Sequence, residues 1–78
     1  MNATWIRVEY ALESLGDISA TAYEAELTDA LKARWPGALV DIARTGNNRY
    51  NGENADIEIP SEEIKSVSES VFAALCGK

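Results

Sequence analysis

Residues 4–12 read Thr-Trp-Ile-Arg-Val-Glu-Tyr-Ala-Leu, and this stretch decides the fold class of the chain. Every second residue from Ile6 to Leu12 is apolar and falls on one face of an extended backbone, whereas Trp5 and Arg7 fall on the other face. A period of two with β-branched and aromatic residues is typical of a strand with one buried face. The segment is therefore expected to be a half-buried strand.

A helix is expected over residues 19–35, after a short turn. Ser19 can accept a hydrogen bond from the free amides of the first turn, and Pro36 disfavours helical geometry at the residue before it. Apolar side chains recur every four residues along this segment, which places them in one stripe facing the core. The residues of the stripe are Tyr23, Leu27, Leu31 and Trp35.

Two further strands are expected at residues 39–43 and 55–59, because both segments are short and rich in aliphatic residues. In the second of them, Ile57 and Ile59 are expected to face inward. The polar residues 45–54 between these strands are expected to form an extended hairpin loop. Long loops on rigid strands often carry function.

A second helix is expected from Ser61, as its cap, to the residue before Gly77. Glu62 and Glu63 fall in its first turn, where carboxylates complement the positive end of the helix dipole. Its expected core stripe consists of Ile64, Val67, Val71 and Leu75.

These segments predict an α+β fold with the order β-α-β-β-α, in which a three-stranded sheet carries two helices on one face. Residues 1–78 are expected to form one small acidic domain. Because two helices on short connections cover only one side of a sheet, the other side is expected to face solvent or a partner.

The charge balance favours some classes of partner over others. Thirteen acidic and seven basic residues give a formal net charge of −6, which argues against direct nucleic-acid binding. Carboxylates can instead occupy a basic surface that evolved for phosphate, or they can serve solubility alone. No apolar run approaches the roughly 18 residues of a membrane span. The single cysteine and an N-terminus unlike a signal peptide favour the cytoplasm.

The residue types needed for catalysis are scarce. Histidine is absent, which removes the usual general base and the commonest metal ligand. Cys76 falls in a last helical turn, where the dipole disfavours a thiolate. The glycines form no phosphate-binding motif. We therefore expect no catalytic residue, no metal site and no cofactor, and the chain is not expected to be an enzyme.

Three features suit recognition of another protein, and each has a simpler explanation as solvated surface. Trp5 lies on the open sheet face, and tryptophan is enriched in binding hot spots. Arg44, Arg49 and Tyr50 are expected to project from the hairpin loop. Acidic residues crowd the last strand and the second helix, where they can attract a basic groove. The candidate partner-binding residues are Asp56, Glu58, Glu62, Glu63, Glu69, Trp5, Arg49 and Tyr50.

Three stretches together resemble the DinI-like family of DNA-damage-inducible proteins. They are residues 6–10 (Ile-Arg-Val-Glu-Tyr), residues 26–36 (Glu-Leu-Thr-Asp-Ala-Leu-Lys-Ala-Arg-Trp-Pro) and residues 61–71 (Ser-Glu-Glu-Ile-Lys-Ser-Val-Ser-Glu-Ser-Val). Members of that family are small acidic β-α-β-β-α domains that bind RecA and modulate its filament on single-stranded DNA. The resemblance implies a DNA-like acidic ridge on the second helix, carried here by Glu62, Glu63 and Glu69. Residues 73–78 depart from the family, because they are apolar and then basic rather than acidic.

The expected function is that of a non-enzymatic modulator or inhibitor of a nucleic-acid-handling protein. Its partner would be a protein with a basic nucleic-acid-binding surface, such as a RecA-like filament. An alternative is a phage-encoded inhibitor of the anti-CRISPR type, which blocks the DNA-binding surface of a CRISPR effector complex. A third possibility is a structural or assembly partner, as a monomer or as a homodimer through the open sheet face.

Overall fold

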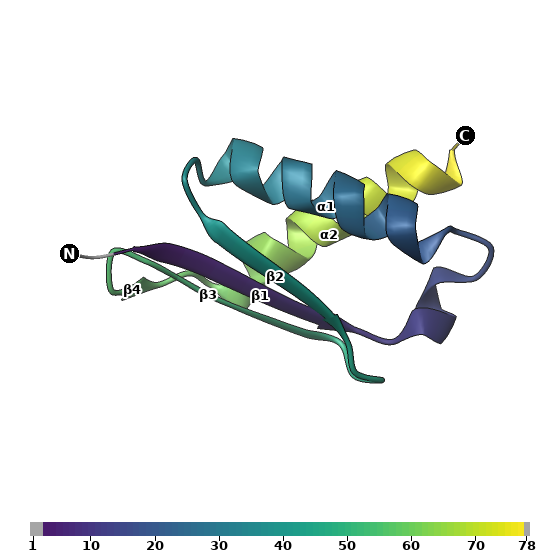
Figure 1. Ribbon diagram of the computed structural model, residues 1–78, viewed down its shortest axis with the longest axis horizontal. Coiled ribbons are helices and arrows are strands. Elements are labelled where there is room, and N and C mark those ends of the chain that lie inside the picture. The colour runs from purple at the N-terminus through teal and green to yellow at the C-terminus, as the bar shows by residue number, and fades with distance from the viewer. Residues whose placement is uncertain (1–2, 78) are drawn as a thin grey trace.

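The computed structural model describes residues 3–77, which fold into an α+β arrangement of two helices on one face of a four-stranded mixed sheet (Figure 1). The strands lie in the order β2-β1-β3-β4. The central strand β1 pairs parallel with β2 and antiparallel with β3. The elements are β1 (Thr4–Tyr10), the 3₁₀ helix η1 (Leu12–Leu15), α1 (Ala20–Arg34), β2 (Leu39–Arg44), β3 (Arg49–Asn54), β4 (Ile57–Glu58) and α2 (Ser61–Cys76).

Strand β1 buries the face that its alternation predicts. Ile6, Val8 and Tyr10 are at most 2% exposed and lie at the centre of the core, whereas Arg7 faces solvent. The strand ends two residues earlier than expected. Leu12 belongs to η1 instead and is 52% exposed, because the chain leaves the sheet at Ala11 to reach the helical layer.

Helix α1 also follows its sequence pattern. The Ser19 hydroxyl accepts a hydrogen bond from the amide of Ala22 at 3.3 Å, which confirms the predicted cap. Tyr23, Leu27 and Leu31 are buried against the sheet, as the four-residue spacing requires.

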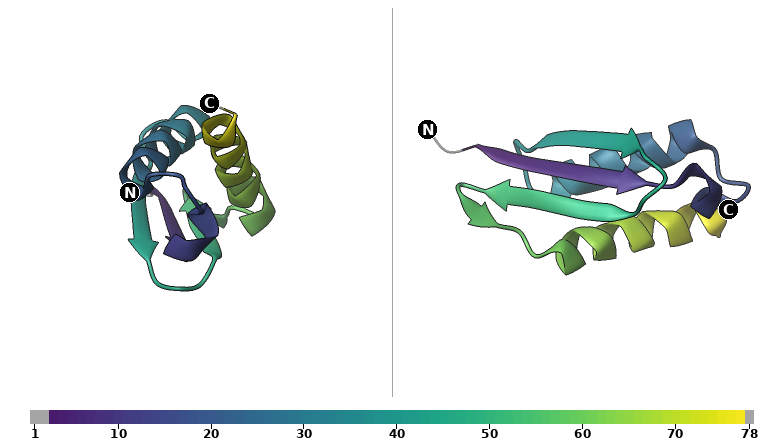
Figure 2. Two further views of the ribbon diagram at one scale, coloured as in Figure 1. Left: turned by 90° about the vertical axis from the view of Figure 1, so that its right-hand side faces the viewer. Right: turned by 90° about the horizontal axis from the view of Figure 1, so that it is seen from below.

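Helix α2 packs beside α1 over the same face of the sheet (Figure 2). Ile64 and Val71 are buried, and the helix ends before Gly77 as predicted. The predicted cap at Ser61 is wrong. The N-cap residue is Pro60, and no side chain caps the helix, but the two glutamates of the first turn complement the helix dipole.

The prediction of three strands is wrong in the second half of the sheet. Strand β2 is confirmed, but β3 occupies Arg49–Asn54, where a polar loop was expected. The segment expected as a strand at residues 55–59 contributes only Ile57–Glu58 to β4. Ile57 is 72% exposed rather than inward, whereas Ile59 is buried as predicted. Hydrogen bonding to β1 along its whole length makes residues 49–54 a strand despite their polar composition.

Gly52 allows α2 to lie close to the sheet. A Cβ atom at this position would lie 2.9 Å from the Trp5 carbonyl oxygen and 3.2 Å from the Ile64 Cδ1 atom. Ile59 Cδ1 would be almost as near, at 3.3 Å. Any larger residue would therefore force strand and helix apart.

The turn between β3 and β4 contains two residues in left-handed conformation. Ala55 has a φ of 53° and Asp56 a φ of 69°, as two-residue hairpin turns of type I′ require. Alanine has a steric cost there that glycine lacks. We expect Ala55→Gly to raise the free energy of unfolding by about 0.5 to 1 kcal/mol in urea denaturation followed by circular dichroism.

Ala33, an exposed residue inside α1, provides the control for this substitution. There the same change to glycine is expected to lower stability by about 1 kcal/mol, because glycine is a poor helix former. Equal losses at the two positions would contradict the proposed strain at Ala55.

Candidate partner-binding site

Acidic residues concentrate where β3, β4 and the start of α2 meet. Glu53 and Glu58 lie directly opposite each other in the β3–β4 register. Like charges in this arrangement repel each other and destabilise the strand pair. Glu53 accepts a hydrogen bond from the Trp5 indole N–H at 3.3 Å, whereas Glu58 is exposed. The pair therefore creates a local negative potential that a cationic group would relieve.

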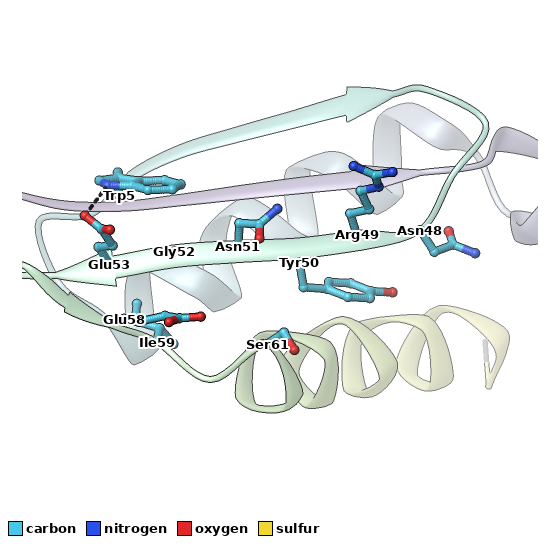
Figure 3. A pocket seen from close by; sticks show the side chains of 10 residues that line it. All are labelled: Trp5, Asn48, Arg49, Tyr50, Asn51, Gly52, Glu53, Glu58, Ile59 and Ser61. Carbon is cyan, nitrogen blue, oxygen red and sulfur yellow. Dashed lines mark hydrogen bonds between the residues drawn. The ribbon is translucent and has the colours of Figure 1, made fainter.

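A groove of about 490 Å³, which we call the edge groove, runs along the outer edge of β3 beside this acidic pair (Figure 3). Four of the predicted binding residues line it, namely Trp5, Arg49, Tyr50 and Glu58. Figure 3 shows that Trp5 and Arg49 rise on the open side of the sheet, whereas Tyr50 points toward α2. The structure thus brings together residues from β1, β3 and β4 that are far apart in the sequence.

The other four predicted residues lie outside the edge groove. Asp56 is in the β3–β4 turn, and Glu62 and Glu63 follow in the first turn of α2. Glu63 is partly neutralised, because its carboxylate lies 3.5 Å from the Arg34 guanidinium of α1. Glu69 lies seven residues after Glu62, about two helical turns, and both are exposed on the outer side of α2.

A second groove, of about 320 Å³, continues between β3 and α2 toward η1. Asn48 and Tyr50 line both grooves, so the two meet along β3. Leu15 and Phe72 give this second groove an apolar character, and Glu69 lies at its rim. We call it the apolar groove.

The predicted binding residues did not include several residues that line these grooves, among them Asn48, Glu53 and Phe72. Glu53 and Asn48 were assigned to a loop, and Phe72 lies at the margin of the α2 core stripe. No signal in the sequence marks Phe72 as a groove residue, because its 36% exposure beside the stripe is a property of the tertiary structure.

Arg44, Arg49 and Tyr50 do not project from a loop as predicted, because Arg44 belongs to β2 and the other two belong to β3. Tyr50 is half-buried against the core, on the side of β3 that faces the helices. Arg44 lies at the end of β2 and donates hydrogen bonds to Glu24 at 2.9 Å and to the Tyr10 hydroxyl at 3.1 Å. Its positive charge is therefore paired with the Glu24 carboxylate of the same chain.

The Tyr10 hydroxyl also donates a hydrogen bond to Glu24. This bond, with that from Arg44, lowers the pKa of the Glu24 carboxyl from its ordinary value. Burial, followed by the bond to Glu24, raises the pKa of Tyr10. The cluster ties α1 to the ends of β1 and β2.

The open sheet face combines neutralised charges with an apolar end. Arg7 forms ion pairs with Asp41 and with Glu9, the latter at 3.6 Å. Trp5 and Leu39 are neighbours in the parallel register and are 38% and 69% exposed. The charge available to a partner is therefore at the β4 end of the molecule, not at the centre of this face.

Residues 3–77 contain no group of three or more carboxylate or cysteine side chains placed to hold a metal ion. In the same part of the chain, no helix has both the length and the apolar character needed to cross a membrane. Comparisons with protein-family models, with curated proteins and with solved structures found no match to this chain. The resemblance to the DinI-like family thus stays a hypothesis.

Proposed function

We propose that this chain is a non-enzymatic, protein-binding modulator that docks on the basic surface of a nucleic-acid-handling protein in the cytoplasm. The observation that carries the proposal is the charge of residues 53–63, which include five acidic residues and no basic one. Folding places this segment at one end of the molecule, across the β3–β4 turn and the first turn of α2. A surface evolved to bind phosphate is electrostatically complementary to such an end.

Glu62 and Glu69 extend this acidic surface along the outer side of α2. Successive carboxylates along a rigid helix resemble the regular charges of a nucleic-acid backbone. They would compete for a groove that binds DNA and accelerate encounter with it. The resemblance to the DinI-like family makes a RecA filament on single-stranded DNA the first partner to test. A CRISPR effector complex is the second.

The test compares two double variants with the same change of charge. In Glu62→Lys/Glu69→Lys the outer side of α2 is reversed, whereas in Glu26→Lys/Asp29→Lys the reversal is on exposed residues of α1. We expect the α2 variant to bind filaments about tenfold more weakly in co-sedimentation, because each exposed charge pair turns from attraction to repulsion. Its binding should also depend less on salt.

The α1 variant is expected to bind within about twofold of the original protein. Equal loss in both variants would mean that net charge alone matters. Absence of binding to RecA filaments and to a CRISPR effector complex, or direct binding to DNA at physiological salt, would contradict the proposal.

A further inference from the structure

The outer edge of β3 is only partly paired. Strand β4 covers Glu53 and Asn54, and the Ile59 amide donates a hydrogen bond to the Gly52 carbonyl at 2.9 Å. Pro60 then leads the chain away into α2. Within residues 3–77, no strand lies beside the portion of this edge that precedes Gly52.

The backbone of Tyr50 is directed toward this free edge. The N–H and C=O groups of one strand residue in an antiparallel ladder point to the same side, and the side alternates along the strand. Gly52 points its carbonyl outward, to Ile59, so Tyr50 two residues earlier also points outward. Tyr50 therefore offers one donor and one acceptor to an incoming strand.

Helix α2 extends beyond the sheet on the same side. Seen from below, its ribbon lies outside β3 instead of behind the strands (Figure 2). Phe72 on this helix is 36% exposed, and it lines the apolar groove together with Tyr50 and Leu15. An additional strand beside β3 would cover this flank, because the inward side chains of a strand point toward the helical layer.

The charges along the combined grooves favour one kind of strand. Glu53 and Glu58 line the edge groove and Glu69 lines the apolar groove, against a single guanidinium from Arg49. Glu53 and Glu58 also face each other across β3 and β4, so a cation between them would relieve their repulsion. The complementary segment is basic on its open side and apolar on its inner side.

We propose that the partner contributes an extended segment with alternating apolar and basic residues, which binds the free edge of β3 as an additional strand. Backbone hydrogen bonds to Tyr50 would supply affinity. A lysine or arginine beside Glu53 and Glu58, with an apolar residue against Phe72, would supply specificity. This inference rests on the proposed function for the identity of the partner, but the edge can be tested without it.

The test uses isotope-labelled protein and two capped six-residue peptides, acetyl-Arg-Val-Lys-Leu-Arg-Val-amide and acetyl-Glu-Val-Asp-Leu-Glu-Val-amide. With the basic peptide we expect chemical-shift changes at residues 48–52 and exchange of the Tyr50 amide slowed about tenfold, because that amide becomes hydrogen-bonded. The acidic peptide should produce neither effect at the same concentration. Shifts confined to β2, the other edge strand, would overturn the inference.

Two variants test the two parts of the site separately. Glu58→Lys should weaken binding of the basic peptide about tenfold, whereas Glu26→Lys, with the same charge change on α1, should leave it within about twofold. N-methylation of the Tyr50 amide, introduced by chemical synthesis, removes the outward donor and should abolish binding while the fold persists. Undiminished binding by either the Glu58→Lys or the N-methylated protein would overturn the inference.

The outcomes separate this inference from the proposed function. Loss of filament binding in Glu62→Lys/Glu69→Lys, with no peptide at the β3 edge, would leave the proposed function standing and remove the strand addition. Peptide binding at the edge without any binding to filaments or effector complexes would support the strand addition and remove the proposed function. Shifts at residues 48–52 that grow with protein concentration alone would show a second copy at this edge and overturn the inference.

Discussion

Gly52→Val is expected to lower the free energy of unfolding by about 3 kcal/mol, because it inserts a side chain between β3 and α2 where no space exists. A Cβ atom alone would lie 2.9 Å from the Trp5 carbonyl oxygen, and that oxygen belongs to the paired backbone of β1 and cannot move freely. Ile64, at 3.2 Å, is fully buried in the core. The strand and the helix must therefore separate. Urea denaturation followed by tryptophan fluorescence measures the loss.

Asn51→Val is the matched control for this substitution. Asn51 is the neighbour of Gly52 in β3, but it is exposed on the open side of the sheet. Valine is a good strand former, so its introduction there should change stability by less than about 0.5 kcal/mol. If the two valine variants were equally stable, the close approach of α2 to β3 would be wrong.

The second large effect is expected at a buried pair of hydroxyl groups between the helices. The hydroxyl oxygen of Tyr23 in α1 lies 2.7 Å from the Oγ atom of Ser68 in α2, and the two residues are 3% and 4% exposed. Tyr23→Phe and Ser68→Ala should each lower the free energy of unfolding by about 2 kcal/mol, because each leaves a buried hydroxyl without a partner. The double variant should lose far less than the sum, which gives a coupling energy of about 1 to 2 kcal/mol in a double-mutant cycle.

Alkaline pH gives an independent check on this pair. Burial raises the pKa of the Tyr23 hydroxyl above its ordinary value of 10.0. A group whose pKa is higher in the folded state stabilises the fold fully below its unfolded pKa, and this contribution is lost as the pH rises through the folded pKa. Tyr23→Phe should therefore lose less stability than the original protein above pH 10. Additive losses in the cycle, with the same alkaline decline in both proteins, would contradict the buried bond.

The candidate site depends on this packing, because contacts in the core hold α2 and β3 in the positions that a partner would meet. Gly52 sets the distance between them, and Tyr50 connects the core to both grooves. Sites on rigid elements hold their geometry better than sites on loops. A peptide that binds at the β3 edge would therefore find a groove that is already formed.

Local periodicity was sufficient to predict the parts of this protein whose side chains alternate between core and solvent. The inward face of β1 and the buried stripe of α1 follow from it, because burial repeats with the geometry of a strand or a helix. The acidic concentration in residues 53–63 is equally visible in the sequence.

Pairing between distant segments decided the rest. Residues 49–54 show no apolar alternation. Tyr50 and Gly52 are the residues of this strand that are buried toward the helical layer, and Gly52 has no side chain that would appear in a hydrophobic pattern. They form a strand because β1 supplies their hydrogen bonds. Long-range contacts also pair Arg44 with Glu24, and β4 is only two residues long, which leaves the edge of β3 before Gly52 free. Which backbone groups remain unpaired is a property of the assembled sheet, and no local pattern in the sequence encodes it.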